Sequence, residues 1–131
     1  MPVARKVWQQ TAGEVLQVFL VRALSDFAGR DGADALHHVY AREGPGSYGF
    51  MVNSGLTTLP ESWDAKPGTG NSMTHLMLGH LLEWHFAYVA GLRQAPGSTG
   101  WKDVLIAPQP PRPGTEPAKA LRQAAAAFDS P

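Results

Sequence analysis

The chain has 131 residues, 44% of them hydrophobic, and equal numbers of basic and acidic side chains, 11 of each, so its formal charge is zero. This length suits one domain, and the neutral balance argues against nucleic acid as a partner, because nucleic-acid binding calls for a basic face. The sequence contains no cysteine, which excludes disulfides and thiolate metal sites. For the same reason, the cysteine content does not indicate whether the protein lies in an oxidising or a reducing compartment.

The N-terminal part contains an apolar stretch from residue 15 to residue 24, interrupted by Arg22. It is too short to span a bilayer, and no signal-peptide cleavage pattern follows it. We therefore expect a core helix and no membrane partner. The localisation is left open, with the cytoplasm expected if the N-terminus is native.

A helical hairpin is predicted over residues 12–42. Thr11 and Glu14 match a capping box, and the first helix is expected to end at Gly29. The second helix, over residues 33–42, is expected to turn Leu36, Val39 and Tyr40 inward. Apolar residues at helical spacing predict the buried face of the first helix: Val15, Phe19, Leu20, Ala23, Leu24 and Phe27. Two short helices cannot bury both faces by themselves, so further helices are expected against them.

A loop and a third helix are predicted next. Residues 48–52 are expected to be extended, and a polar loop rich in Gly and Pro then carries Glu61, Trp63 and Asp64. The third helix is expected from about Thr74 to residue 90, with Gly91 at its end. Its side chains predicted to be buried or packed are Leu78, Leu82, Phe86 and Val89, with Trp84 and Tyr88 beside them.

The histidines do not match a metal site. His37 and His38 are adjacent and point about 100° apart on a helix. His75, His80 and His85 recur every five residues, which leaves successive side chains about 140° apart on a helix. We therefore predict no metal.

The C-terminal part is expected to hold one strand, over residues 101–107, followed by a stiff Pro-rich connector. The alanine-rich tail, residues 116–131, favours a helix or disorder by composition.

Four sequence words, in one order, resemble the end of the catalytic domain of the bacterial α-L-rhamnosidases, the six-hairpin glycoside hydrolases of family 78. They are SYGFM, GLTTLPESWD, NSMTHLMLGHLLEWHFAYVAGL and GWKDVLIAPQP, and they lie between residues 47 and 110. The resemblance implies a mainly α fold, a fragment of an (α/α)6 toroid, with a short β segment near the C-terminus. Residues 1–92 then correspond to C-terminal hairpins of the catalytic domain, and residues 93–131 to a linker and the truncated start of a C-terminal β-domain.

The resemblance also implies site residues and a substrate, and no cofactor. The Glu of the T-T-x-W-E word, here Glu61, acts in the family as general base in inverting hydrolysis of α-L-rhamnosides. The His of the S-x-N-H word, here His75, contacts the rhamnose. Trp63 is a further candidate for substrate contact, by covering an apolar sugar face, and packing is an equally good interpretation of this side chain.

Departures from the family pattern limit what this chain is expected to do alone. Pro60, Thr74 and Leu76 stand where the family has Trp, Asn and Pro, and the D-E-R-x-G-W-type word that carries the general acid is absent. Three hypotheses follow: a rhamnosidase fragment, inactive alone, that needs an N-terminal partner fragment; a carbohydrate-binding module without catalysis; and a helical interaction protein whose apolar faces bind a partner or a second copy.

Overall fold

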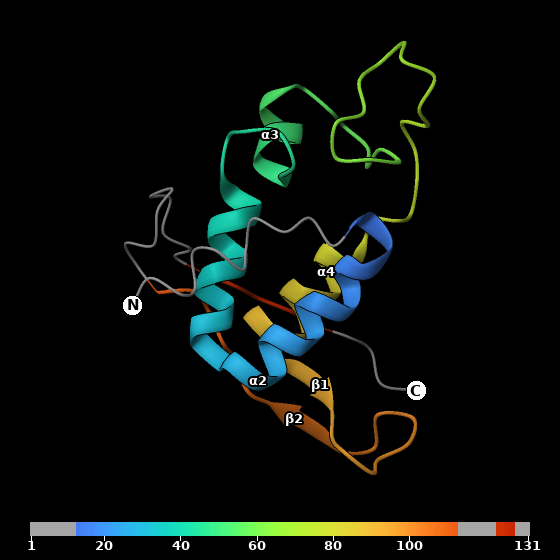
Figure 1. Cartoon of the computed structure of the whole chain (residues 1–131). Helices are drawn as coiled ribbons and strands as arrows, with labels where there is room; N and C mark the ends of the chain where they lie inside the picture. Colours follow the sequence, from blue (N-terminus) through green and yellow to red (C-terminus); the bar gives the residue numbers. More distant parts are fainter. Residues whose placement is uncertain (1–12, 113–122, 128–131) are drawn as a thin grey trace.

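The structure is a computed structural model that describes residues 13–112 and 123–127. Its elements are α2 (Gly13–Ala41), α3 (Tyr48–Asn53), α4 (His80–Trp84), the π-helix η1 (His85–Val89), β1 (Leu92–Gln94) and β2 (Val104–Ile106). The helices form the body, with the long loop between α3 and α4 at one end and the β1–β2 hairpin at the other (Figure 1). The fold is therefore mainly α with a short antiparallel β segment near the C-terminus, which confirms the predicted fold class.

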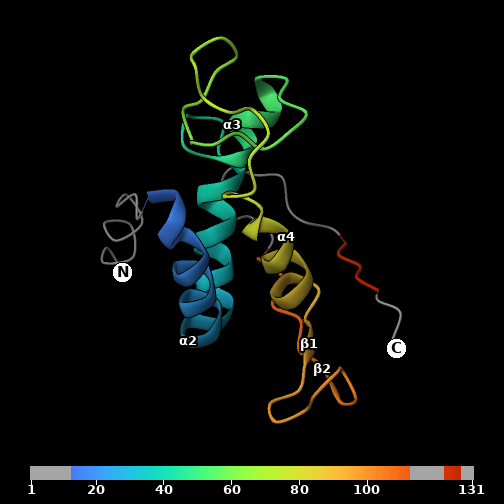
Figure 2. The ribbon, with the colours of Figure 1, turned by 90° about the vertical axis from the view of Figure 1, so that its right-hand side faces the viewer.

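The predicted helical hairpin is present and lies within α2. Gly29, with φ 51° and ψ −128°, breaks the helical path and divides α2 into two helices that run side by side (Figure 2). Such a positive φ is readily adopted only by glycine. The two halves approach closely at Gly32, where a Cβ atom would lie 2.3 Å from the carbonyl oxygen of Leu24. The predicted capping box of Thr11 and Glu14 lies outside the described side chains.

The buried face of the first half of α2 differs from the prediction. Gln17, Val21 and Ser25 are buried, whereas the predicted inward residues Phe19 and Phe27 are 60% and 91% exposed. Val15 and Ala23 are exposed as well, and Leu20 and Leu24 are half-buried. The reason is that α4 and the second half of α2 pack on the Val21 side, and no described element covers the opposite side.

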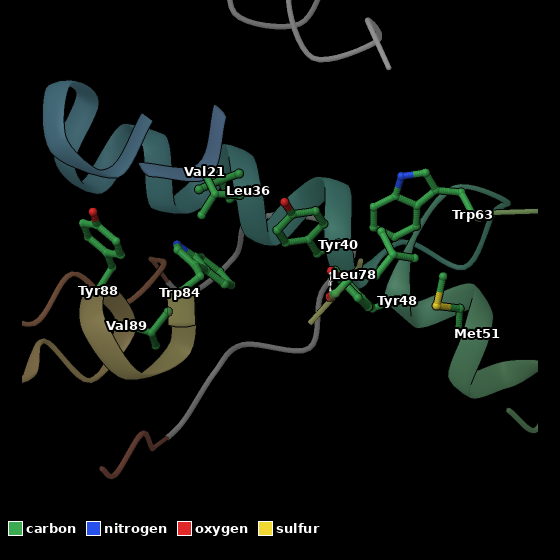
Figure 3. Packing of buried hydrophobic residues seen from close by; sticks show 10 residues of the cluster. All are labelled: Val21, Leu36, Tyr40, Tyr48, Met51, Trp63, Leu78, Trp84, Tyr88 and Val89. Carbon is green, nitrogen blue, oxygen red and sulfur yellow. Dashed lines mark hydrogen bonds between the residues drawn. The ribbon is translucent and has the colours of Figure 1, made fainter. Parts of the chain in front are cut away.

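One hydrophobic cluster connects the helices and the loop (Figure 3). Leu36 and Tyr40 lie in it as predicted, and Trp84 and Tyr88 pack in it at 1% and 6% exposure. The cluster comprises Val21, Leu36, Tyr40, Tyr48, Met51, Trp63, Leu78, Trp84, Tyr88 and Val89. A bidentate ion pair from Arg22 to Glu83, at 2.7 and 2.9 Å, also joins α2 to α4.

The segment predicted to be extended, residues 48–52, is helical and forms α3. Ser47 is its N-cap, because the Ser47 hydroxyl accepts a hydrogen bond from the Phe50 N–H at 3.1 Å. The same hydroxyl donates to the carbonyl oxygen of Arg42 at 2.6 Å. The prediction of an extended segment was wrong, because the capping serine is a strong local signal for a helix start.

The third helix begins later than predicted. Residues 74–79 form bends and a turn, and the helix begins at His80 as α4 and continues as η1 to Val89. The residues predicted to start the helix make a different contact, because the backbone N–H of His75 donates to the Leu59 carbonyl at 2.8 Å. Leu78 and Val89 are buried as predicted, whereas Leu82 is 76% exposed.

The C-terminal strand is shorter than predicted and pairs with a strand that the sequence did not indicate. β2 pairs with β1 in antiparallel register, with Leu92 opposite Ile106. Trp101 has a φ of 58°, so the expected strand cannot begin there. The expected apolar core of this strand is instead exposed, with Ile106 at 74%.

The β hairpin is fastened to the helices by Arg93. Its guanidinium lies 4.8 Å from the centre of the Tyr88 ring and 3.4 Å from the Asp26 carboxylate. The predicted division between residues 92 and 93 falls within β1 and stays a prediction. In the tail, residues 123–127 are not helical, and the remainder of the predicted tail lies outside the described residues. Within the described ranges, no helix is both long and apolar enough to cross a bilayer.

Candidate functional site

Backbone hydrogen bonds bring together the two loop segments that carry the predicted site residues. The His75 N–H donates to Leu59 O, and the Glu61 N–H donates to Ser72 O, both at 2.8 Å. The Thr58 hydroxyl donates to the carbonyl oxygen of Met73. Residues 58–61 and 72–75 therefore lie side by side and close the loop between them at its base. Glu61 and His75, fourteen positions apart in the sequence, belong to these paired segments.

The Glu61 carboxylate is exposed and held at the base of this loop. Its Oε2 atom accepts the backbone N–H of Ser72 at 3.0 Å. Within residues 13–112 and 123–127, no protein group donates to the other oxygen, Oε1. The contact therefore orients the carboxylate and leaves one oxygen for a water molecule or a ligand.

His75 is half-buried, and its ring orientation is defined by one hydrogen bond. Its Nδ1 atom lies 3.2 Å from the backbone nitrogen of Met77, which is a donor. Nδ1 must therefore be the acceptor, and the neutral ring carries its proton on Nε2. The Nε2–H group is then the donor that this ring offers to a ligand hydroxyl.

Trp63 lies in the core beneath the loop and is 9% exposed. Its ring is stacked at 22° to the Tyr40 ring, with 6.3 Å between centroids, and meets the Tyr48 ring edge-on at 5.0 Å. Figure 3 shows the three rings in one group. This packing anchors the loop to α2 and α3, so Trp63 supports the position of the Glu61 segment. Asp64 is exposed and accepts the Ser62 hydroxyl at 2.9 Å.

A buried polar network lies next to Trp63, and the sequence did not indicate it. The His80 Nε2 atom lies 3.2 Å from the Tyr40 hydroxyl and 3.4 Å from that of Tyr48. Tyr40 donates to Gln17 Oε1 at 3.3 Å, and Tyr48 donates to Leu78 O at 2.6 Å. Burial lowers the pKa of His80, and a contact with the Met77 carbonyl and the charge of Glu83 oppose this effect. The network joins α2, α3 and α4 directly under the loop.

We expect this network to make the stability fall as the pH decreases below about 6.5, the pKa of a histidine in an unfolded chain. Because the pKa of His80 is lowered in the folded state, the unfolded state binds the proton first and acid favours unfolding. The measurement is the free energy of urea unfolding between pH 8 and pH 5, for the wild-type chain and for His80→Gln.

The His80→Gln variant keeps a hydrogen-bond donor near the tyrosines but does not titrate. It is expected to show a shallower slope of stability against pH. The slope will not disappear, because burial lowers the pKa of His37 as well. Equal slopes for the two proteins would exclude His80 as a source of the pH dependence.

Among the described residues, no group of three or more His, Cys, Asp and Glu side chains is arranged to hold a metal ion. The chemistry that this site offers is therefore that of one exposed carboxylate, one neutral imidazole with a free N–H group, and the polar backbone of the loop. Such a set can accept a proton from a water molecule and bind the hydroxyl groups of a ligand.

Comparison with known proteins assigns the family. The profile of the bacterial alpha-L-rhamnosidase 6 hairpin glycosidase domain matches residues 2–89, which include the whole candidate site. An alpha-L-rhamnosidase of Streptomyces avermitilis is 34% identical over 115 residues, 82% of this chain. One from Formosa agariphila is 30% identical over 95 residues, 67% of this chain.

The chain spans only 11% and 10% of the lengths of these two relatives. No solved structure matches the chain. The family match covers most of the chain, and the matched residues contain the helical hairpin, the closed loop and the paired Glu61 and His75 segments. The chain therefore belongs to the six-hairpin glycosidase family of the bacterial α-L-rhamnosidases.

Proposed function

We propose that this chain supplies one side of the active site of an α-L-rhamnosidase, which hydrolyses terminal α-L-rhamnosides with inversion. The observation that carries the proposal is the pairing of residues 58–61 with residues 72–75, which sets Glu61 beside the His75 segment. Family membership supports the substrate class, because the relatives are named alpha-L-rhamnosidases.

In this proposal, Glu61 is the general base. A water molecule bound to its free oxygen attacks the anomeric carbon, and the carboxylate takes the proton of that water. The Ser72 N–H, 3.0 Å from Oε2, holds the carboxylate in place during this step. A fixed carboxylate is an advantage, because a base that is already oriented does not have to be ordered when the reaction occurs.

His75 and Trp63 position the sugar and the loop. The Nε2–H of His75 donates to a hydroxyl group of the rhamnose, since its Nδ1 atom is occupied by the Met77 N–H. Trp63 holds the loop against Tyr40 and Tyr48. A contact between the small exposed part of the Trp63 ring and the sugar remains a prediction.

The chain by itself does not supply the second catalytic group. Inverting hydrolysis needs a carboxylic acid on the other side of the sugar, about 6.5–9.5 Å from the base. Asp64 is on the same loop as Glu61 and bound to Ser62, so it approaches from the same side. The general acid must come from the remainder of the six-hairpin domain, and the isolated chain is expected to be inactive.

The test is turnover of 4-nitrophenyl α-L-rhamnopyranoside. The purified chain is assayed alone and together with an N-terminal partner, which is the Streptomyces avermitilis relative lacking the segment that matches this chain. We expect no turnover by the chain, none by the partner, and turnover by the mixture. Turnover by the chain alone would overturn the assignment of the acid to the missing part. Sugar binding by the chain, with an inactive mixture, would favour a carbohydrate-binding module instead.

A further inference from the structure

One face of α2 carries a row of large apolar side chains that no described element covers. In its first half, Leu16, Phe19 and Phe27 are 56%, 60% and 91% exposed. Ala23 is exposed between them, and these four residues are called the α2 stripe below. Val15, 61% exposed, borders the stripe. The side chains buried on the same helix, among them Val21, face the other way.

The spacing of the α2 stripe indicates what kind of surface it fits. Its members are three, four and four residues apart, which places them on one side of a helix over about three turns. An apolar row of this spacing is the ridge that one helix presents to another helix. The stripe therefore suits a packed helix better than a small ligand, for which a concave pocket is the usual site.

Charged pairs lie along one edge of the α2 stripe. Arg22 pairs with Glu83 at 2.7 Å, and Asp26 pairs with Arg93 at 3.4 Å. An apolar centre with a charged border is the usual organisation of a protein interface. The border has both signs and the whole chain has a formal charge of zero, whereas a helix that lies on an anionic membrane carries a predominantly basic polar face. These charges favour a protein partner over a lipid surface.

The family identifies the partner. The matching profile describes a domain of six hairpins, whereas the described residues contain α2 as a hairpin and α3, α4 and η1 as shorter helical pieces. The chain covers 11% of the length of the Streptomyces avermitilis relative, so most of the length of that relative has no counterpart in the chain. A helix of a neighbouring hairpin, which the described residues do not contain, is therefore the element that we expect the stripe to contact.

We infer that the α2 stripe is the docking face for a helical hairpin from the remainder of a six-hairpin domain. Docking covers Leu16, Phe19 and Phe27 and completes the packing of α2. The inference rests on the proposed function in one respect, since both require the remainder of the domain, but it is measured by binding and not by turnover.

The test co-expresses the full 131-residue chain, carrying an affinity tag, with the Streptomyces avermitilis relative lacking the matching segment. The complex is purified and its mass is determined by size exclusion with light scattering. We expect a one-to-one complex. Phe19→Glu is expected to reduce the affinity at least about tenfold, because a carboxylate would be buried in an apolar contact.

The matched control is Ile106→Glu, which places the same charge at a side chain that is 74% exposed on β2 and does not belong to the stripe. It is expected to leave the complex unchanged. Circular dichroism of Phe19→Glu should retain the helical signal of the wild-type chain, since the Phe19 side chain is 60% exposed among the described residues. A photoreactive residue at position 19, activated in intact cells, provides a second measurement that does not require a soluble complex. It is expected to cross-link to the partner.

Four results would overturn the inference: a complex insensitive to Phe19→Glu, no cross-link from position 19 to the partner, a homodimer of this chain held by the stripe, or stripe-dependent binding to lipid vesicles. The chain with Glu61→Gln should form the same complex as the wild-type chain. A stripe-dependent complex without turnover would reject the proposed function alone. Turnover restored equally by wild-type and Phe19→Glu chains would reject the docking face alone.

Discussion

Replacing Glu61 by Gln is expected to lower the turnover of the complemented assembly by about 10²–10⁴-fold, the usual contribution of a general base. The amide cannot take a proton from water, but its oxygen can still accept the Ser72 N–H that Glu61 Oε2 accepts at 3.0 Å. The loop should therefore keep its closure, and the loss should fall on the chemical step. The measurement is kcat and KM on the chromogenic rhamnoside, at equal concentrations of assembled complex.

Asp64→Asn is the matched control for Glu61→Gln. This carboxylate is exposed on the same loop, and the Ser62 hydroxyl that binds it can bind an amide oxygen instead. Asp64→Asn should change kcat by less than about threefold, because this side chain is not expected to transfer a proton. If Asp64→Asn removes the activity and Glu61→Gln keeps it, the base has been assigned to the wrong carboxylate.

Trp84→Ala is expected to destabilise the chain by about 3–5 kcal/mol, the usual cost of removing a buried tryptophan. The Trp84 side chain is 1% exposed and meets the Tyr40 ring edge-on at 5.9 Å. Small domains have unfolding free energies of about 5–15 kcal/mol in total, so much of the stability depends on this contact. The measurement is urea unfolding followed by circular dichroism.

Two further variants separate the causes of the Trp84 effect. Leu82→Ala lies on the same helix but at a side chain that is 76% exposed, and it should change the stability by no more than about 0.5 kcal/mol. Trp84→Phe should lower the unfolding free energy less than Trp84→Ala does, because an aromatic ring is retained. The substitution also removes the Nε1–H, which is buried without a partner among the described residues. Equal losses for Leu82→Ala and Trp84→Ala would show that this cluster is not the core.

The sequence alone determined the elements that depend on local chemistry. The turn at Gly29 and the helix end at Gly91 follow from glycine, which readily adopts the positive φ found at both positions. The inward positions Leu36 and Tyr40 follow from helical spacing. Glu61 and His75 were candidates because their sequence words resemble a known family, and the family match over residues 2–89 confirms that resemblance. Their roles stay predictions.

Only the tertiary structure decided which of several compatible local patterns was used. The start of the third helix is at His80 because the backbone of His75 is paired with Leu59, a contact between residues far apart in the sequence. The buried face of the first half of α2 is the one that carries Val21, because α4 and the second half of α2 lie on that side. The stripe around Phe19 is left exposed. An apolar row indicates that a helix face is to be buried, but the position of the neighbouring elements decides which face is covered and by what.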